Sequence, residues 1–94
     1  MDSDVRLDHD QAEDLHRRAT NQGQLVMWIV TWNTSDYPQE AAARPHFIGP
    51  GTVNTQKFVL LADTLDELRQ QLPSGLDKLD RAQNDDPVII EIWI

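Results

Sequence analysis

The sequence contains no cysteine among its 94 residues. Disulfide bonds, thiolate chemistry and cysteine-based zinc sites are therefore excluded. Long hydrophobic runs are also missing, because no apolar stretch approaches the ~20 residues that a membrane-spanning helix needs. The N-terminus is acidic, whereas a signal peptide begins with a basic and then an apolar segment. From these absences we expect a cytoplasmic protein with no membrane partner.

Basic residues are scarce, since eight Lys and Arg face sixteen Asp and Glu and leave a net charge of −8. We expect no nucleic-acid binding, because that requires Lys and Arg to neutralise phosphates. Two interpretations of the acidity stay open. It maintains solubility, or it belongs to an acidic inhibitor of phage type that mimics a nucleic acid.

The strongest local signal lies between residues 57 and 72. Residues 57–62 read Lys-Phe-Val-Leu-Leu-Ala, which is typical of a short buried strand without Gly or Pro. A helix follows directly, because Thr64 and Glu67 match a capping box and leucines at 65, 68 and 72 form one apolar stripe. Pro73 ends this helix. The pattern predicts a helix that packs across a sheet.

Residues 25–32 are rich in β-branched and aromatic side chains, which predicts a central strand. Alternation divides this strand between two faces, with Val26, Trp28, Val30 and Trp32 on one and Leu25, Met27, Ile29 and Thr31 on the other. One helix covers only one face of a sheet. The other face then meets the N-terminal segment, a ligand or a second subunit, and we favour a second subunit.

Two further strands complete the expected sheet. Residues 41–48 predict a strand that Pro45 restricts to an edge or splits, because proline donates no backbone hydrogen bond. Residues 88–94 alternate Val and Ile with Ile, Glu and Trp and predict the last strand. The first residue of the strand that includes residues 57–62 is either Lys57 or Thr52, and both alternatives stay open.

These elements together predict an α+β fold. We expect a small, antiparallel-dominated sheet of about four strands with one helix packed across it, in the order β-β-β-α-β. Residues 74–79 fit either another turn of helix or an irregular crossover. The N-terminal helix is optional in this arrangement.

Residues 1–24 differ from the single domain expected over residues 25–94. They form an acidic extension that is partly disordered or holds one marginal helix starting near Asp10. His9, Glu13 and His16 would share one face of that helix, at a spacing that suits a divalent metal. Solvated polar side chains explain the pattern more simply, so we assign no metal site.

Few residues are candidates for a catalytic or binding site. Asp36 and Tyr37 lie in a predicted loop, and Arg44 and His46 lie on the next strand, so a hairpin would bring the four together. Asp36 with His46 is a conceivable acid–base pair for a small enzyme. A half-buried His and a paired Arg are the simpler interpretation, so we assign no catalytic residue and no cofactor.

A second acidic pair and the tryptophans complete the candidates. Asp85 and Asp86 precede a proline and suit a turn rather than catalysis. Trp28, Trp32 and Trp93 either form the core or mark a binding surface, because tryptophan is favoured at the centres of interfaces.

Five phrases in order carry a resemblance: Met27-Trp28, Asp36-Tyr37-Pro38, residues 62–69 (Ala-Asp-Thr-Leu-Asp-Glu-Leu-Arg), residues 72–76 (Leu-Pro-Ser-Gly-Leu) and residues 85–93 (Asp-Asp-Pro-Val-Ile-Ile-Glu-Ile-Trp). The chain resembles a family of small bacterial and phage proteins without an assigned activity. Members often begin at the position of Met27, which implies that residues 1–26 are an extension or follow a misplaced start. Pro45 departs from the family pattern. The resemblance supports the fold and supplies no mechanism.

We therefore expect a small non-enzymatic protein-interaction or regulatory protein. Its partner is another protein or a second copy of itself, which would make a homodimer. The acidic inhibitor and the small enzyme using Asp36, Arg44 and His46 are the alternatives. The candidate binding residues are Trp32, Asp36, Tyr37, Arg44, His46 and Trp93.

Overall fold

The computed structural model describes residues 4–50, 57–79 and 89–94. Their helices and strands are, in order, β1 (Val5–Arg6), α1 (His9–Asn21), β2 (Leu25–Trp32), β3 (Ala41–Ile48), β4 (Phe58–Ala62), α2 (Leu65–Gln71), β5 (Lys78–Leu79) and β6 (Ile89–Trp93). The predicted α+β class is confirmed. The expected count of about four strands and one helix was too low, because β1 and β5 have two residues each and are too short to show alternation.

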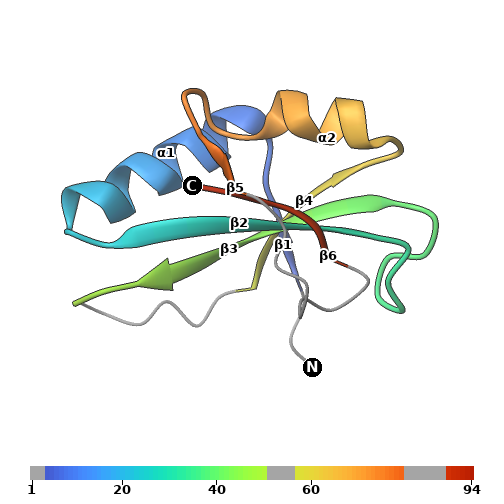
Figure 1. Cartoon of the computed structure of the whole chain (residues 1–94), viewed down its shortest axis with the longest axis horizontal. Coiled ribbons are helices and arrows are strands. Elements are labelled where there is room, and N and C mark those ends of the chain that lie inside the picture. Colours follow the sequence, from blue (N-terminus) through green and yellow to red (C-terminus); the bar gives the residue numbers. More distant parts are fainter. Residues whose placement is uncertain (1–3, 51–56, 80–88) are drawn as a thin grey trace.

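The strands form one mixed sheet in the order β1-β4-β3-β2-β6-β5. The pairing of β1 with β4 is parallel, and the other pairings are antiparallel. β2 lies between β3 and β6, as its apolar sequence predicted. Figure 1 shows α1 and α2 on the same side of this sheet.

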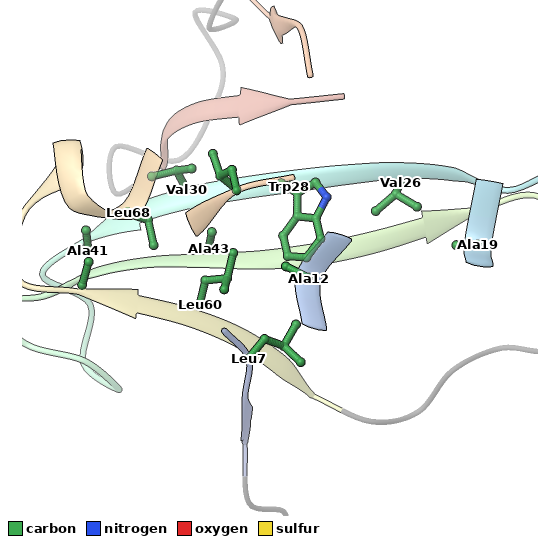
Figure 2. Packing of buried hydrophobic residues seen from close by; sticks show 12 residues of the cluster. Leu7, Ala12, Ala19, Val26, Trp28, Val30, Ala41, Ala43, Leu60 and Leu68 are labelled. Carbon is green, nitrogen blue, oxygen red and sulfur yellow. The ribbon is translucent and has the colours of Figure 1, made fainter. Parts of the chain in front are cut away.

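The core lies between the two helices and the sheet face toward them. Val26, Trp28 and Val30 of β2 are fully buried there, and Figure 2 shows the Trp28 ring among the packed side chains. Leu60 of β4 and Leu68 of α2 belong to the same cluster. The alternation predicted for β2 holds from Leu25 to Thr31, because the other set of side chains is partly exposed. Trp32, predicted on the same face as the buried set, is 39% exposed.

α1 begins at a capping box that the sequence analysis missed. The Asp8 carboxylate accepts from the Gln11 backbone N–H, and the Gln11 side chain accepts from the Asp8 N–H. Ala12 and Ala19 then turn small side chains toward the sheet and are buried. Leu7, Ala12 and Ala19 share one core cluster with β2 and β4, so residue 24 does not mark a break in the hydrophobic core.

α2 follows the predicted boundaries closely. The Thr64 hydroxyl accepts from the Glu67 backbone N–H at 3.2 Å, and Leu72 ends the helix in an extended conformation before Pro73. Leu68 and Leu72 point into the core. Propensity and capping therefore agree with packing in this element.

Pro45 lies within a continuous β3. β4 pairs with β3 only from Ala41 to Ala43, so beyond Ala43 β3 has its ladder to β2 alone. A proline is tolerated in this stretch because only one described strand pairs with it. Both predictions for β3 were wrong, because the strand is not split and does not lie at the edge of the sheet but between β4 and β2.

The chain after α2 forms neither a further helical turn nor a purely irregular crossover. Lys78 and Leu79 pair with β6, and Asp77 and Ile94 exchange two backbone hydrogen bonds of 2.6 and 2.9 Å. The predicted turn at residues 84–87, the strand start at Thr52 and Val88 lie outside the described residues. No helix in the described part of the chain is long and apolar enough to cross a membrane.

Candidate functional site

One face of the sheet carries no described helix, and we call it the open face. Because side chains alternate along each strand, it carries Leu25, Met27, Ile29 and Thr31 of β2, Ala42, Arg44, His46 and Ile48 of β3, Val59 and Leu61 of β4, Leu79 of β5 and Ile92 of β6. Ala42 and Val59 are buried, and the other side chains are partly or largely exposed. Leu25 and Ile48 lie opposite each other and are 47% and 51% exposed. Two neighbouring apolar side chains of the open face are therefore about half accessible to solvent.

Arg44 is the main charged group of the open face. Its guanidinium donates to the Asp4 carboxylate from Nη1 to Oδ1 at 3.1 Å and from Nη2 to Oδ2 at 2.9 Å. The Tyr37 hydroxyl donates to the same carboxylate, and the Arg44 guanidinium carbon lies 5.7 Å from the centre of the Tyr37 ring. We call Arg44 and Tyr37 the carboxylate receptor, because the planar guanidinium matches both oxygens of a carboxylate.

The loop between β2 and β3 positions Tyr37. The Tyr37 backbone N–H donates to the Thr34 hydroxyl at 3.2 Å, and the Gln39 N–H donates to the Asn33 side chain at 2.9 Å. Asn33 and Gln39 both adopt positive φ angles, of 55° and 61°. Such local side-chain bonds are what the turn-forming residues of this loop predicted.

Two hollows open beside the receptor. One of about 370 Å³ is lined by Asp4, Asp36, Arg44, Pro45, His46, Lys57 and Phe58. The other, of about 300 Å³, is lined by Ile29, Thr31, Thr34, Asp36, Tyr37, Ala42, Arg44, His46 and Ile89. Four predicted candidates, Asp36, Tyr37, Arg44 and His46, therefore surround one hollow, and their role in binding stays a prediction.

Electrostatics hold the receptor in one charge state. The Arg44 hydrogen bonds, and then the Tyr37 hydroxyl, lower the pKa of Asp4 from 3.8 to about 2. Asp4 in turn raises the pKa of both Tyr37 and Arg44. At neutral pH the site is thus an ionised carboxylate held by a cation and a protonated phenol.

This arrangement is suited to binding rather than to proton transfer. The nearest carboxylate oxygen of Asp36 lies 3.8 Å from Arg44 Nη2, too far for a hydrogen bond. Among the described residues, no hydrogen bond or ion pair joins His46 to Asp36. The conceived acid–base pair therefore lacks the contact that would define it.

Trp32 and Trp93 lie away from this site. Trp93 is the cross-strand partner of the buried Trp28, and Trp32 is that of the buried Ala41, so both are on the helix-covered side of the sheet. The Trp93 indole donates to Glu91 at 3.1 Å. The open face is consequently a different surface from the one that these two candidates mark.

Of the three residues considered for a metal, His9 and Glu13 contact each other, and His16 is bound elsewhere. Glu13 accepts from the Ser74 hydroxyl at 2.6 Å and lies 3.4 Å from His9. His16 accepts at Nδ1 from the Trp28 indole at 3.1 Å. Within the described residues no group of His, Cys, Asp or Glu side chains could hold a metal ion.

Sequence reasoning missed Asp4 and the cluster around Glu91. Asp4 is one acid among six in residues 1–24, and nothing in its neighbours points to Arg44. Glu91 lies among apolar residues on a strand, and this position could have indicated a buried carboxylate. A buried carboxylate needs a cationic partner. It accepts from Arg69 Nε at 3.1 Å and also from Arg69 Nη2.

No family model matches the chain, and neither a curated protein nor a solved structure does.

Proposed function

We propose that this protein is a non-enzymatic interaction module that binds another protein through its open face. The observation that carries the proposal is the contrast between the two sides of β2. Val26, Trp28 and Val30 are buried under the helices, while Leu25 and its partner Ile48 are about half exposed on the other side. Burying such a pair against a partner is favourable by about 25 cal/mol for each Å² of apolar surface removed from water.

The face is a better candidate than the sheet edges. The edge strands β1 and β5 have two residues each, which leaves little backbone for a partner strand to pair with. The stretch of β3 beyond β4 carries Pro45, which lacks a donor. These features disfavour binding by strand addition and support contact through side chains of the open face.

The acidic-mimic alternative has weaker support. Arg17 and Arg18 both pair with Asp14 on α1, at 2.5 and 3.0 Å, and Arg69 pairs with Asp66 on α2 at 3.1 Å. Cations thus interrupt the acids on the helix side. A mimic of a nucleic acid needs a continuous series of carboxylates, so the interaction module is the preferred proposal.

The test compares two variants of the full chain. Leu25→Glu with Ile48→Glu places charges on the open face at positions that contribute little to the core. Trp32→Ser, which changes a residue 39% exposed on the helix-covered side, is the matched control. Circular dichroism first shows that both fold.

Affinity capture from the source organism, quantified by mass spectrometry, and light scattering after size exclusion are the measurements. We expect a partner, or a dimer of the chain itself, that Trp32→Ser retains and the double variant loses. Retention by the double variant with loss in Trp32→Ser would move the binding surface to the helix-covered side. Equal binding by both variants would refute the open face as the site.

A further inference from the structure

We propose that the carboxylate receptor on the open face is a docking site for an acidic residue of the partner, and that Asp4 fills it when no partner is bound. This inference rests on the proposed binding function of the open face. It adds a ligand class, a peptide carboxylate next to an apolar side chain. It also makes the N-terminal segment a competitor for the site.

The receptor already shows how it holds a carboxylate. Arg44 contacts both oxygens of Asp4, and the Tyr37 hydroxyl donates a third hydrogen bond to the same group. An Asp or Glu side chain from another protein would find the same three donors. The chain is acidic overall, so a cation at this position favours an acidic ligand over a basic one.

The surroundings of the receptor define the rest of the ligand. Arg44 is the cross-strand partner of Ile29, and both line the hollow of about 300 Å³ together with Ala42 and Ile89. The small side chain of Ala42 leaves room over the floor of this hollow. A ligand whose carboxylate reaches Arg44 therefore places a neighbouring side chain against an apolar floor.

Asp4 is held in a way that allows exchange. β1 is a two-residue strand whose side chains are exposed. The backbone bonds that join this segment to β4 run from Val5 N–H to the Lys57 carbonyl and from Leu7 N–H to the Val59 carbonyl, both 2.8 Å. Short, exposed edge elements open at low free energy. Leu7 remains buried in the core, so Asp4 can leave the receptor without releasing α1.

When Asp4 competes for the receptor, the apparent dissociation constant of a ligand equals its intrinsic value divided by the fraction of molecules whose receptor is open. A partly exposed ion pair favours the closed state, with Asp4 bound, over the open state by about fivefold. Removing the Asp4 charge should therefore tighten binding of an acidic peptide by about fivefold, although Asp4 lies on this chain and not on the ligand.

The experiment is a titration of the full chain, ¹⁵N-labelled, with acetyl-Leu-Asp-Leu-amide, followed by NMR at the Arg44 Nε–Hε and Tyr37 amide signals. Acetyl-Leu-Asn-Leu-amide has the same shape without the charge. We expect the Asp peptide to bind Asp4→Asn about fivefold more tightly than the unchanged chain, and the Asn peptide to shift neither signal.

Two control variants make the result specific. Asp36→Asn removes a charge whose nearest oxygen is 3.8 Å from Arg44 Nη2, and it should change the affinity less than Asp4→Asn does. Arg44→Lys in the Asp4→Asn background keeps the positive charge but loses the planar fork. Followed at the Tyr37 amide signal, it should lose most of the binding.

Three results would overturn the inference. These are equal affinity of Asp4→Asn and the unchanged chain, equal binding of the Asp and Asn peptides, and binding that Arg44→Lys leaves intact. None of them bears on Leu25 and Ile48, whose variants test the open face independently. Failure of the receptor is thus distinguishable from failure of the proposed function.

Discussion

Two arginine–carboxylate pairs lie on opposite faces of the sheet and share the same chemistry. On the helix-covered face, Arg69 donates twice to Glu91 and the Trp93 indole donates a further hydrogen bond to it. On the open face, Arg44 donates twice to Asp4 and an aromatic hydroxyl again completes the group. The contacts match, and the surroundings differ.

The difference lies in the access of the carboxylate to water, because the two arginines are similarly exposed, Arg69 at 38% and Arg44 at 32%. Glu91 is 3% exposed and has Lys78 at 3.5 Å as a second cation, whereas Asp4 is 21% exposed. A buried carboxylate that loses its partners is left without solvation, while an exposed one is taken up by water. The same set of bonds therefore stabilises the fold on one face and forms a replaceable contact on the other.

The largest effect should come from Glu91→Ala. It removes the buried acceptor of the Arg69 and Trp93 hydrogen bonds. Because a hydrogen bond to a charged group contributes about 1.5 to 3 kcal/mol, the free energy of unfolding should fall by about 3 to 4 kcal/mol. Urea denaturation followed by tryptophan fluorescence measures this change.

Asp66→Ala is the matched control, because Asp66 is the exposed acid on the same arginine, with Arg69 Nη1 at 3.1 Å. Its effect should stay below about 1 kcal/mol. Similar losses in the two variants would contradict the burial argument.

The second comparison uses neighbours on β4. Leu60 is fully buried on the helix side, and Leu61 is partly exposed on the open face. Leu60→Ala should cost about 3 kcal/mol through lost burial and a cavity. Leu61→Ala should cost about 1 kcal/mol or less in the isolated chain. Chemical denaturation of both variants tests whether the two faces differ as described, and a costlier Leu61→Ala would show that the open face is packed.

The third prediction concerns mild acid. Burial lowers the pKa of His16 below 6.5, and the neutral ring accepts from the buried Trp28 indole. The unfolded chain then binds the proton more readily, so stability is complete above pH 6.5 and falls as the pH drops below it. The loss is on the order of 1 kcal/mol, the net value of one hydrogen bond.

Thermal unfolding of the unchanged chain and of His16→Gln from pH 7.5 to 5 measures this effect. The variant should show a flatter profile over that range, because it lacks the group that titrates. If stability depended on pH in the same way in both proteins, His16 would not be the group that titrates.

The smallest effect should come from Asp4→Asn on the open face. The folded-state pKa of Asp4 is lowered from 3.8 to about 2, so its contribution to stability is present above pH 4 and is lost as the pH falls toward 2. At pH 7 this pKa difference sets an upper limit of about 2.5 kcal/mol on the loss. Because water reaches both side chains of the pair and screens the interaction, the variant should lose about 1 kcal/mol or less. Its unfolding free energy should approach that of the unchanged chain as the pH falls through 2. A loss as large as that of Glu91→Ala would mean that the two pairs are equivalent.

Much of the fold could be predicted because its signals are local. The alternation in β2 identified the buried and the exposed side chains, and Thr64 and Pro73 marked the limits of α2. The short strands β1 and β5 could not be predicted, because two residues carry no periodicity and their pairing depends on the strands beside them. The parallel pairing of β1 made the sheet mixed, which no local pattern indicated.

The candidate site was predicted in part for a similar reason. A hairpin between β2 and β3 brings Asp36 and Tyr37 near Arg44 and His46, and a loop of this length makes that a short-range inference. Asp4 lies 40 residues from Arg44 in the chain, and Arg69 lies 22 residues from Glu91. Contacts at such separations depend on how the sheet and helices pack.

The sequence by itself determined the longer strands, the helix α2 and the side chains of β2 that are buried, because backbone propensity, capping and alternation act over a few residues. Only the tertiary structure decided that both helices lie on one side of the sheet and that Asp4 meets Arg44. The physical reason is that a face is covered or left open by elements distant in the chain. The same arginine–carboxylate pair therefore stabilises the fold where the helices cover it and forms a replaceable contact where they do not.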